Sequence, residues 1–163
     1  MTLTLGIDPG TAIVGYGLVR ELNDGSLQTV DYGVIRTKPK IPMWERLKII
    51  HDDLQTIINR HQPDQAAVEE LFFAKNVTTA ITVAQGRGVI LLALAAHDIV
   101  IAEYKPNEVK QSITGYGGAN KAQMQEMTRI LLGLDDIPRP DDAADALAIA
   151  ITHLHSMRFN SLY

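Results

Sequence analysis

The chain has 163 residues, of which 46% are hydrophobic and 21% charged, so we expect one ordinary globular domain rather than a disordered chain. It contains no cysteine, which excludes disulfides, thiolate zinc sites and a cysteine nucleophile. With 19 acidic and 15 basic residues the net charge is -4, which by itself argues slightly against a nucleic-acid partner.

The first residues and the apolar runs of the sequence show no secretory or membrane-spanning pattern. No basic segment followed by an apolar stretch opens the sequence, so we expect no secretory signal. The most apolar run, residues 89–96, is too short to cross a bilayer. These features predict a cytoplasmic protein without a membrane partner.

The first third of the chain predicts an antiparallel meander of three strands, at residues 2–8, 15–20 and 27–36. The first strand ends at an Asp-Pro-Gly turn signal. An Asn-Asp-Gly-Ser segment at 23–26 suits a hairpin between the second and third strands, because these residues tolerate positive φ.

Helices and strands then alternate along the rest of the chain. We expect helices at 44–60, 76–96, 106–113, 120–133 and 141–155, with strands at 66–71 and 99–104. Gly86-Arg87-Gly88 is expected to interrupt the second helix. This order predicts an α/β protein with a five-stranded mixed sheet and helices on both faces, as in the ribonuclease H-like fold. We expect a single domain over residues 1–157 and a flexible tail at 158–163.

Two acidic side chains end apolar strands of this sheet. Asp8 closes the first strand, and Glu69 closes the apolar segment Ala66-Ala67-Val68 within the strand expected at 66–71. Ligands gather at the carboxyl ends of adjacent central strands, so the two acids are expected to lie together. Each also has an ordinary explanation: Asp8 suits a turn, and both Glu69 and its neighbour Glu70 suit the rim of a sheet. Strand neighbours point to opposite faces, and the residues alone do not select one glutamate.

A second acidic pair opens the last helix. Asp142 and Asp145 are three residues apart and therefore share one helix face. Acids in a first turn are favoured by the helix dipole, which explains Asp141 and Asp142 better than Asp145 inside an apolar run. Hard divalent cations such as Mg²⁺ prefer carboxylate oxygens, so the four acids predict a metal-dependent phosphoryl-transfer site.

The cations and aromatic residues suggest how DNA could be held near these acids. Without the four suspected ligands the chain has 15 acidic and 15 basic residues, and the cations recur in loops, at Lys75, Arg87, Lys105, Lys110 and Lys121. The segment 115–121 resembles a phosphate-binding loop, but position 120 is Asn rather than Gly and position 122 is Ala rather than Ser/Thr. We therefore interpret it as a mobile loop leading to a helix N-terminus. Of the adjacent aromatics at 72–73, one is expected in the core and the other near Lys75, where it could stack on a base.

Together these segments closely resemble the RuvC family of bacterial Holliday-junction resolvases. The matching segments cover nearly the whole chain: Gly6-Ile7-Asp8-Pro9-Gly10, Gly15-Tyr16-Gly17, Val68-Glu69-Glu70-Leu71-Phe72, Ala74-Lys75-Asn76, residues 85–89, Val109-Lys110-Gln111 and residues 142–153. The resemblance implies that Glu69, Asp142 and Asp145 join Asp8 as catalytic metal ligands.

The resemblance also assigns residues to DNA. It implies that Phe72 stacks on a base and that Lys110 and Lys121 contact the backbone, and we expect Lys75 and Arg87 to contribute as well. The implied activity is symmetric nicking of four-way DNA junctions by two-metal hydrolysis, with two Mg²⁺ per site and Mn²⁺ as a substitute. The products are a 5′-phosphate and a 3′-hydroxyl, in recombination and DNA repair. The implied partners are junction DNA, a second copy of the chain in a homodimer, and the RuvA-RuvB branch-migration complex.

Two other functional classes remain open from the sequence. A non-catalytic junction-binding module would tolerate amide substitution of the four acids. An actin-like nucleotide-dependent phosphotransferase is suggested by Asp-Pro-Gly-Thr at 8–11, but it would need a second phosphate hairpin and a second domain, for which this chain is too short.

Overall fold

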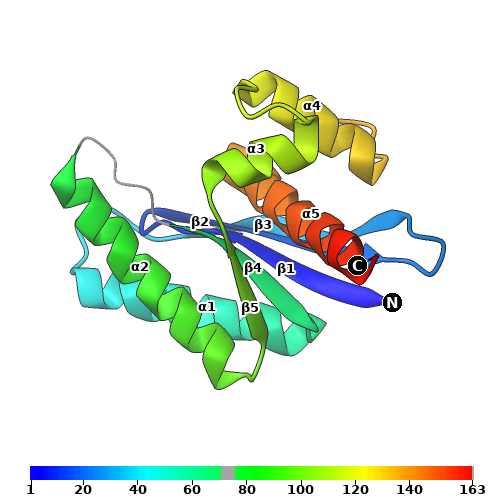
Figure 1. The fold of residues 1–163 in the computed structure, drawn as a ribbon. Helices are drawn as coiled ribbons and strands as arrows, with labels where there is room; N and C mark the ends of the chain where they lie inside the picture. Colours follow the sequence, from blue (N-terminus) through cyan, green and yellow to red (C-terminus); the bar gives the residue numbers. More distant parts are fainter. Residues whose placement is uncertain (71–75, 163) are drawn as a thin grey trace.

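The computed structural model describes residues 1–70 and 76–162, and this part of the chain forms a five-stranded sheet in the order β3-β2-β1-β4-β5 (Figure 1). The strands β1 and β2 pair antiparallel, as do β2 and β3, whereas β1–β4 and β4–β5 pair parallel. The strands are β1 (Thr2–Asp8), β2 (Ile13–Glu21), β3 (Leu27–Arg36), β4 (Gln65–Glu69) and β5 (Val100–Tyr104). The predicted meander and mixed sheet are confirmed.

Helices cover both faces of this sheet, as the sequence predicts for a ribonuclease H-like fold. In Figure 1, α1 and α2 lie on one face, and α3, α4 and α5 lie on the other. The helices are α1 (Met43–His61), α2 (Val77–Ala96), α3 (Pro106–Thr114), α4 (Lys121–Leu132) and α5 (Asp141–Ser161).

Two helices differ from the expectation. The helix α2 runs unbroken through Gly86-Arg87-Gly88, so the predicted interruption is wrong. Two glycines cost a helix roughly 2 kcal/mol relative to alanine, which tertiary packing can offset. The helix α5 extends to Ser161 rather than to 155, and Arg158 within it pairs with Glu21 of β2. The domain boundary at 157 and the flexible tail stay predictions.

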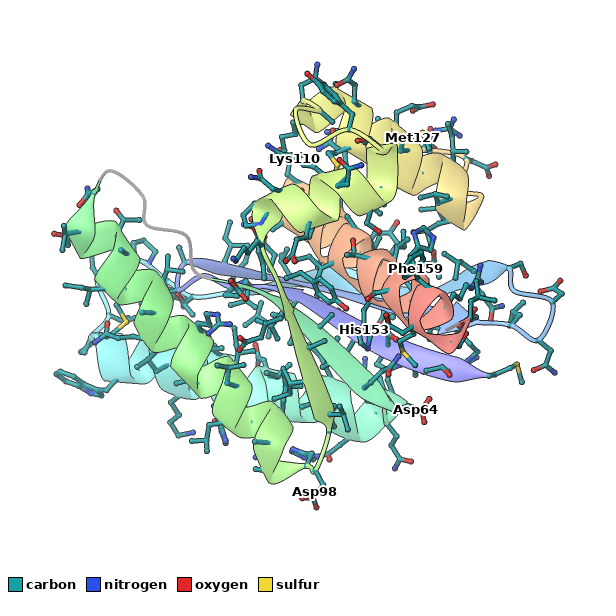
Figure 2. All side chains as sticks on the ribbon, in the orientation of Figure 1. Asp64, Asp98, Lys110, Met127, His153 and Phe159 are labelled. Atoms are coloured by element: carbon teal, nitrogen blue, oxygen red, sulfur yellow. The ribbon has the colours of Figure 1, made fainter. Side chains whose placement is uncertain are left out.

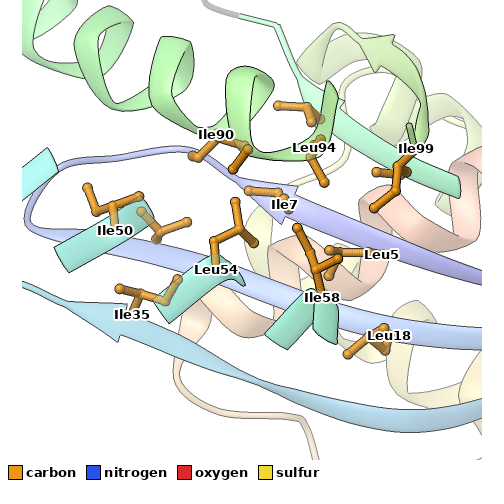
Figure 3. Packing of buried hydrophobic residues seen from close by; sticks show 14 of the residues in the cluster. Leu5, Ile7, Leu18, Ile35, Ile50, Leu54, Ile58, Ile90, Leu94 and Ile99 are labelled. Atoms are coloured by element: carbon orange, nitrogen blue, oxygen red, sulfur yellow. The ribbon is translucent and has the colours of Figure 1, made fainter. Parts of the chain in front are cut away.

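The core between the sheet and α1–α2 follows the alternation of β1. Leu5 and Ile7, two residues apart, are fully buried on this face (Figure 3). They meet side chains of both helices in one cluster: Ile50, Leu54, Ile58, Ile90 and Leu94. Burying a side chain of this size contributes roughly 1.5–3 kcal/mol.

The helix α2 is also long and apolar enough to cross a membrane, the one helix of the described chain that is. Core helices of globular proteins can have the same length and apolar composition, and Ile90, Ala93 and Leu94 of α2 are buried in the core. The opposite side of α2 is exposed, with Val77, Ile81 and Leu92 more than half accessible.

On the other face, the main chain of α5 lies directly on β1 and β2. Glycines of the two strands make this approach possible, because a Cβ at Gly6 would lie 2.1 Å from the carbonyl oxygen of Ala146. A Cβ at Gly15 would lie 2.0 Å from the carbonyl oxygen of Asp142. Neither distance is tolerable for a real Cβ, so these glycines set how closely α5 sits on the sheet.

This packing yields a stability prediction. We expect Gly15→Ala to push the N-terminal turn of α5 away from β2 and to destabilise the protein by about 1–3 kcal/mol, as overpacking generally does. Gly117→Ala is the matched control, because a Cβ there would meet a single atom, at 3.8 Å. Chemical denaturation of both variants checks the prediction, and equal stability of the two would contradict the close contact.

Candidate active site

The end of β1 brings Asp8 opposite the glycine that supports α5. Asp8 is the last residue of β1 and pairs with Gly15 of β2. By strand alternation Asp8 lies on the same face as Gly6, which is the α5 face. Since Gly15 touches the main chain of Asp142, the same contact that seats the helix also brings the first turn of α5 next to Asp8.

Three carboxylates meet at this point. Oxygen atoms of Asp8, Asp142 and Asp145 all lie within 4.8 Å of one another, and the three side chains are half-buried. Asp142 and Asp145 stand on one face of α5, as their spacing predicts. The described residues thus form a cluster of ligand oxygens of the size that one or two divalent cations need.

Glu69 lies beside this cluster, on the neighbouring strand, but outside the group whose oxygen atoms are all within 4.8 Å of one another. It ends β4, which runs parallel to β1 and places its carboxyl end at the same edge of the sheet. Ala67, two residues earlier, packs in the α5-side core, so alternation directs Glu69 to this side. Its carboxylate is close enough to raise the pKa of Asp8. The neighbouring Glu70 donates its main-chain N–H to Tyr104 at 2.8 Å.

Burial and mutual repulsion disfavour negative charge in this cluster. Burial, with the charges of Glu69, Asp145 and Asp142 and a hydrogen bond to Asp142, raises the pKa of Asp8 to about 8. Burial and the charge of Asp145 raise the pKa of Glu69 to about 7, against an opposing effect of Lys110. Burial also raises the pKa of Asp145, although Lys121 opposes it. Without a cation, the cluster resists full ionisation near neutral pH.

These properties fit a divalent metal site. The donors are carboxylate oxygens, which hard cations prefer, and the described cluster contains no histidine. A bound cation would reverse the repulsion that raises the three pKa values. The acidic cluster can therefore hold metal.

Two predicted DNA-contacting lysines flank the acids. Lys110 of α3 and Lys121 of α4 line an open pocket of about 290 Å³ together with Glu69 and Asp145. Figure 2 shows Lys110 on the helices above the edge of the sheet where β1 and β4 end. Lys121 is the first residue of α4, after a capping box in which Asn120 accepts the main-chain N–H of Gln123. The predicted loop leading to a helix N-terminus is confirmed.

Lys121 already has an acidic partner. Its Nζ lies 3.0 Å from a carboxylate oxygen of Asp141, whose other oxygen accepts a hydrogen bond from Gln125 at 3.1 Å. Sequence reasoning assigned Asp141 to the helix dipole and missed this pair. The signal was weak, because the two residues are twenty positions apart and meet only through the packing of α4 on α5.

Of the other predicted DNA-contacting residues, Arg87 does not line the pocket with Lys110 and Lys121, and Phe72 and Lys75 lie outside the described residues. Arg87 of α2 donates from Nε to the main-chain carbonyl of Glu69 at 3.2 Å and pairs with Glu103 of β5 at 2.8 Å. Sequence reasoning did not identify Glu103. Phe72 and Lys75 lie outside the described residues, so their roles stay predictions.

Comparisons with known proteins agree on one family. A family model described as "Crossover junction endodeoxyribonuclease RuvC" matches residues 4–153. A curated protein of that name from Chloroflexus aurantiacus is 60% identical over 152 residues, which cover 93% of this chain and 92% of the relative. Another from Roseiflexus sp. is 55% identical over 155 residues, covering 95% and 92% of the two chains.

Solved structures agree with the sequence comparisons. The structure of "T. thermophilus RuvC in complex with Holliday junction substrate" superposes with a TM-score of 0.93 at 35% identity and covers 99% of this chain and 98% of its own. The yeast mitochondrial Holliday junction resolvase Ydc2, at 12% identity, shares the fold with a TM-score of 0.75 and covers 99% of this chain and 83% of its own. From the sequence match, the acidic cluster and these superpositions, we conclude that the chain belongs to the RuvC family of crossover junction endodeoxyribonucleases.

Proposed function

We propose that this protein is a structure-specific endodeoxyribonuclease that resolves four-way DNA junctions by paired, symmetric nicks. The observation that carries the proposal is the cluster of Asp8, Asp142 and Asp145 within 4.8 Å, beside Glu69, at the carboxyl ends of two parallel strands. The relative from T. thermophilus is described in complex with a Holliday junction substrate, which supports four-way junctions as the substrate class. The expected products are a 5′-phosphate and a 3′-hydroxyl, in recombination and DNA repair.

Each carboxylate has a proposed place in the mechanism. Asp8, at the end of β1, would help to hold two Mg²⁺ ions, for which Mn²⁺ could substitute. Glu69, Asp142 and Asp145 would complete the shells from two sides. When bound, the two ions activate the attacking water and stabilise the leaving 3′ oxygen. The half-buried carboxylates would present these ions to a phosphate bound in the neighbouring pocket.

The cations beside the cluster would bind the DNA backbone. Lys110 and Lys121 line the same pocket as Glu69 and Asp145, so a phosphate held by either lysine would lie next to the metal site. Lys121 must leave Asp141 to do so, and both groups of this pair are about half exposed, which keeps the exchange inexpensive. Phe72 would stack on a base unpaired near the crossover, and Lys75 would contact the backbone beside it.

A homodimer would supply the second active site that paired nicks require. The exposed side chains of Val77, Ile81 and Leu92 stand on one side of α2, where their spacing forms an apolar stripe. An uncovered apolar stripe of this kind commonly marks a protein interface. We propose α2 as the element that joins the two copies, with RuvA-RuvB as a further partner and the cytoplasm as the compartment.

The first test removes the ligands one at a time. Asp8→Asn, Glu69→Gln, Asp142→Asn and Asp145→Asn should each lower cleavage of a synthetic four-way junction to the level seen without added Mg²⁺, because each removes an anionic ligand. Junction binding, measured by gel shift in EDTA, should persist. The matched control is Glu70→Gln, which should cleave like the parent protein. Full cleavage by Asp8→Asn at moderate Mg²⁺ would remove the central claim.

The second test uses the raised pKa of Asp8. Folding raises this pKa from 3.8 to about 8, so the folded protein binds the proton more tightly than the unfolded chain does. The stability due to that proton is complete below about pH 4 and is lost as the pH rises through about 8. Metal-free protein should therefore lose unfolding free energy between about pH 5.5 and 8.5.

Asp8→Asn separates this effect from other titrations. An amide cannot ionise, so the variant should lose less stability over the same pH range and should be more stable than the parent protein at the alkaline end. Urea denaturation in EDTA at the two pH values measures both quantities. A variant that matches the parent protein in pH dependence would show that Asp8 is not the strained group.

The third test concerns the lysines. Lys110→Ala and Lys121→Ala should weaken junction binding and flatten the dependence of log K on log salt concentration by about 0.9 for each lost phosphate contact. Lys48→Ala is the control, because Lys48 is exposed on α1, on the opposite face of the sheet. If the slope of log K against log salt concentration is unchanged in both variants, DNA binds to another part of the surface.

A further inference from the structure

The side chain of Arg87 is directed inward, although its residue type suggests a DNA contact. It is only 16% exposed and uses two of its nitrogens on protein partners. Nε donates to the carbonyl oxygen of Glu69, and Nη2 lies 2.8 Å from the carboxylate of Glu103. Glu103 stands in β5 directly beside Val68 of β4. The guanidinium therefore joins α2 to the ends of both β4 and β5.

The residue before Arg87 touches the end of the other catalytic strand. A Cβ at Gly86 would lie 2.5 Å from the carbonyl oxygen of Gly10 and 3.1 Å from the methyl group of Thr11. Gly10 is two residues beyond Asp8, in the turn that leaves β1. This contact needs a residue without a side chain, which accounts for a glycine inside a continuous helix.

Two consecutive residues of α2, Gly86 and Arg87, therefore contact the segments that carry Asp8 and Glu69. We propose that Gly86 and Arg87 form a brace that fixes the spacing of Asp8 and Glu69, with Arg87 as a positioning residue that acts through the main chain of Glu69. This inference rests on the proposed function, since it deepens the role of the same site. It replaces the expected DNA contact of Arg87 with a contact inside the protein.

The chemistry of the guanidinium supports this use. A planar fork of donors can serve a carbonyl and a carboxylate at once, whereas a lysine ammonium is a point charge that cannot span both. Removing Arg87 would leave Glu103 without its partner and the carbonyl of Glu69 without this donor. Groups that hold metal ligands from behind commonly change metal affinity or activity by about 10–100-fold when they are replaced.

The experiment compares Arg87→Lys, Arg87→Gln and Glu103→Gln with the parent protein in three measurements. The first is Mn²⁺ binding without DNA, by electron paramagnetic resonance. The second is the salt dependence of junction binding in EDTA. The third is cleavage as a function of Mg²⁺ concentration. We expect both Arg87 variants to bind Mn²⁺ about 10–100-fold more weakly and to recover cleavage at high Mg²⁺, with an unchanged salt slope.

Glu103→Gln is the second variant, chosen in case the Arg87 variants do not fold. It keeps Arg87 and the bond to Glu69, so it should fold and show a smaller loss of Mn²⁺ affinity in the same direction. Lys121→Ala is the contrasting variant for the salt dependence, with a flatter slope. Lys48→Ala, exposed on the opposite face of the sheet, is the control that should leave Mn²⁺ binding unchanged. Thermal unfolding of each protein identifies any variant whose losses arise from unfolding.

Two outcomes would overturn the brace. One is a flatter salt slope in Arg87→Gln, restored in Arg87→Lys, with normal Mn²⁺ binding, which would make Arg87 a phosphate contact. The other is a lowered melting temperature with normal Mn²⁺ affinity, which would make it purely structural. Failure of the proposed function is distinct, because the parent protein would then not cleave junctions, whereas the Mn²⁺ titration would still test the brace.

Discussion

The distance between α5 and the sheet is the constraint on which the candidate active site depends. Gly6 and Gly15 let the main chain of the helix rest directly on β1 and β2, closer than any side chain would permit. Because Asp8 is paired with Gly15, this one contact determines how near Asp142 comes to Asp8. A helix seated on ordinary side chains would stand farther from the sheet, and Asp142 and Asp145 could not then lie within reach of a cation beside Asp8.

The short distances between these carboxylates make the site electrostatically unfavourable when no cation is bound. Burial and repulsion raise the pKa of Asp8, Glu69 and Asp145 together, and those of Asp8 and Glu69 rise to about 8 and about 7, so these two groups resist ionisation near neutral pH. The two apolar cores on either side of the sheet supply the stability that tolerates this strain. A site of this kind is preorganised for cations, because little rearrangement is needed when they bind.

The helix α2 contributes to the core, to the strand ends beside the acids and to an exposed apolar surface. Its inner side packs Ile90 and Leu94 in the core, Gly86 and Arg87 contact the strand ends, and its outer side leaves an apolar stripe open. A partner that covers the outer side would therefore contact the same helix that touches the ends of the strands carrying Asp8 and Glu69. The net charge of -4 does not by itself exclude a DNA partner, because Lys110 and Lys121 lie beside the acids and screening limits the effect of distant charges.

Local sequence determined the strands, the turns, the alternation that separates the two faces and the candidate acids at the strand ends, because period-two patterns and turn residues act over a few positions. The family resemblance added the choice of Glu69, while the roles of Phe72 and Lys75 stay predictions. Only the tertiary structure decided that α2 continues through its glycines, that Arg87 turns inward and that Lys121 pairs with Asp141. Each of these depends on contacts between segments far apart in the chain, whose distances no local pattern encodes.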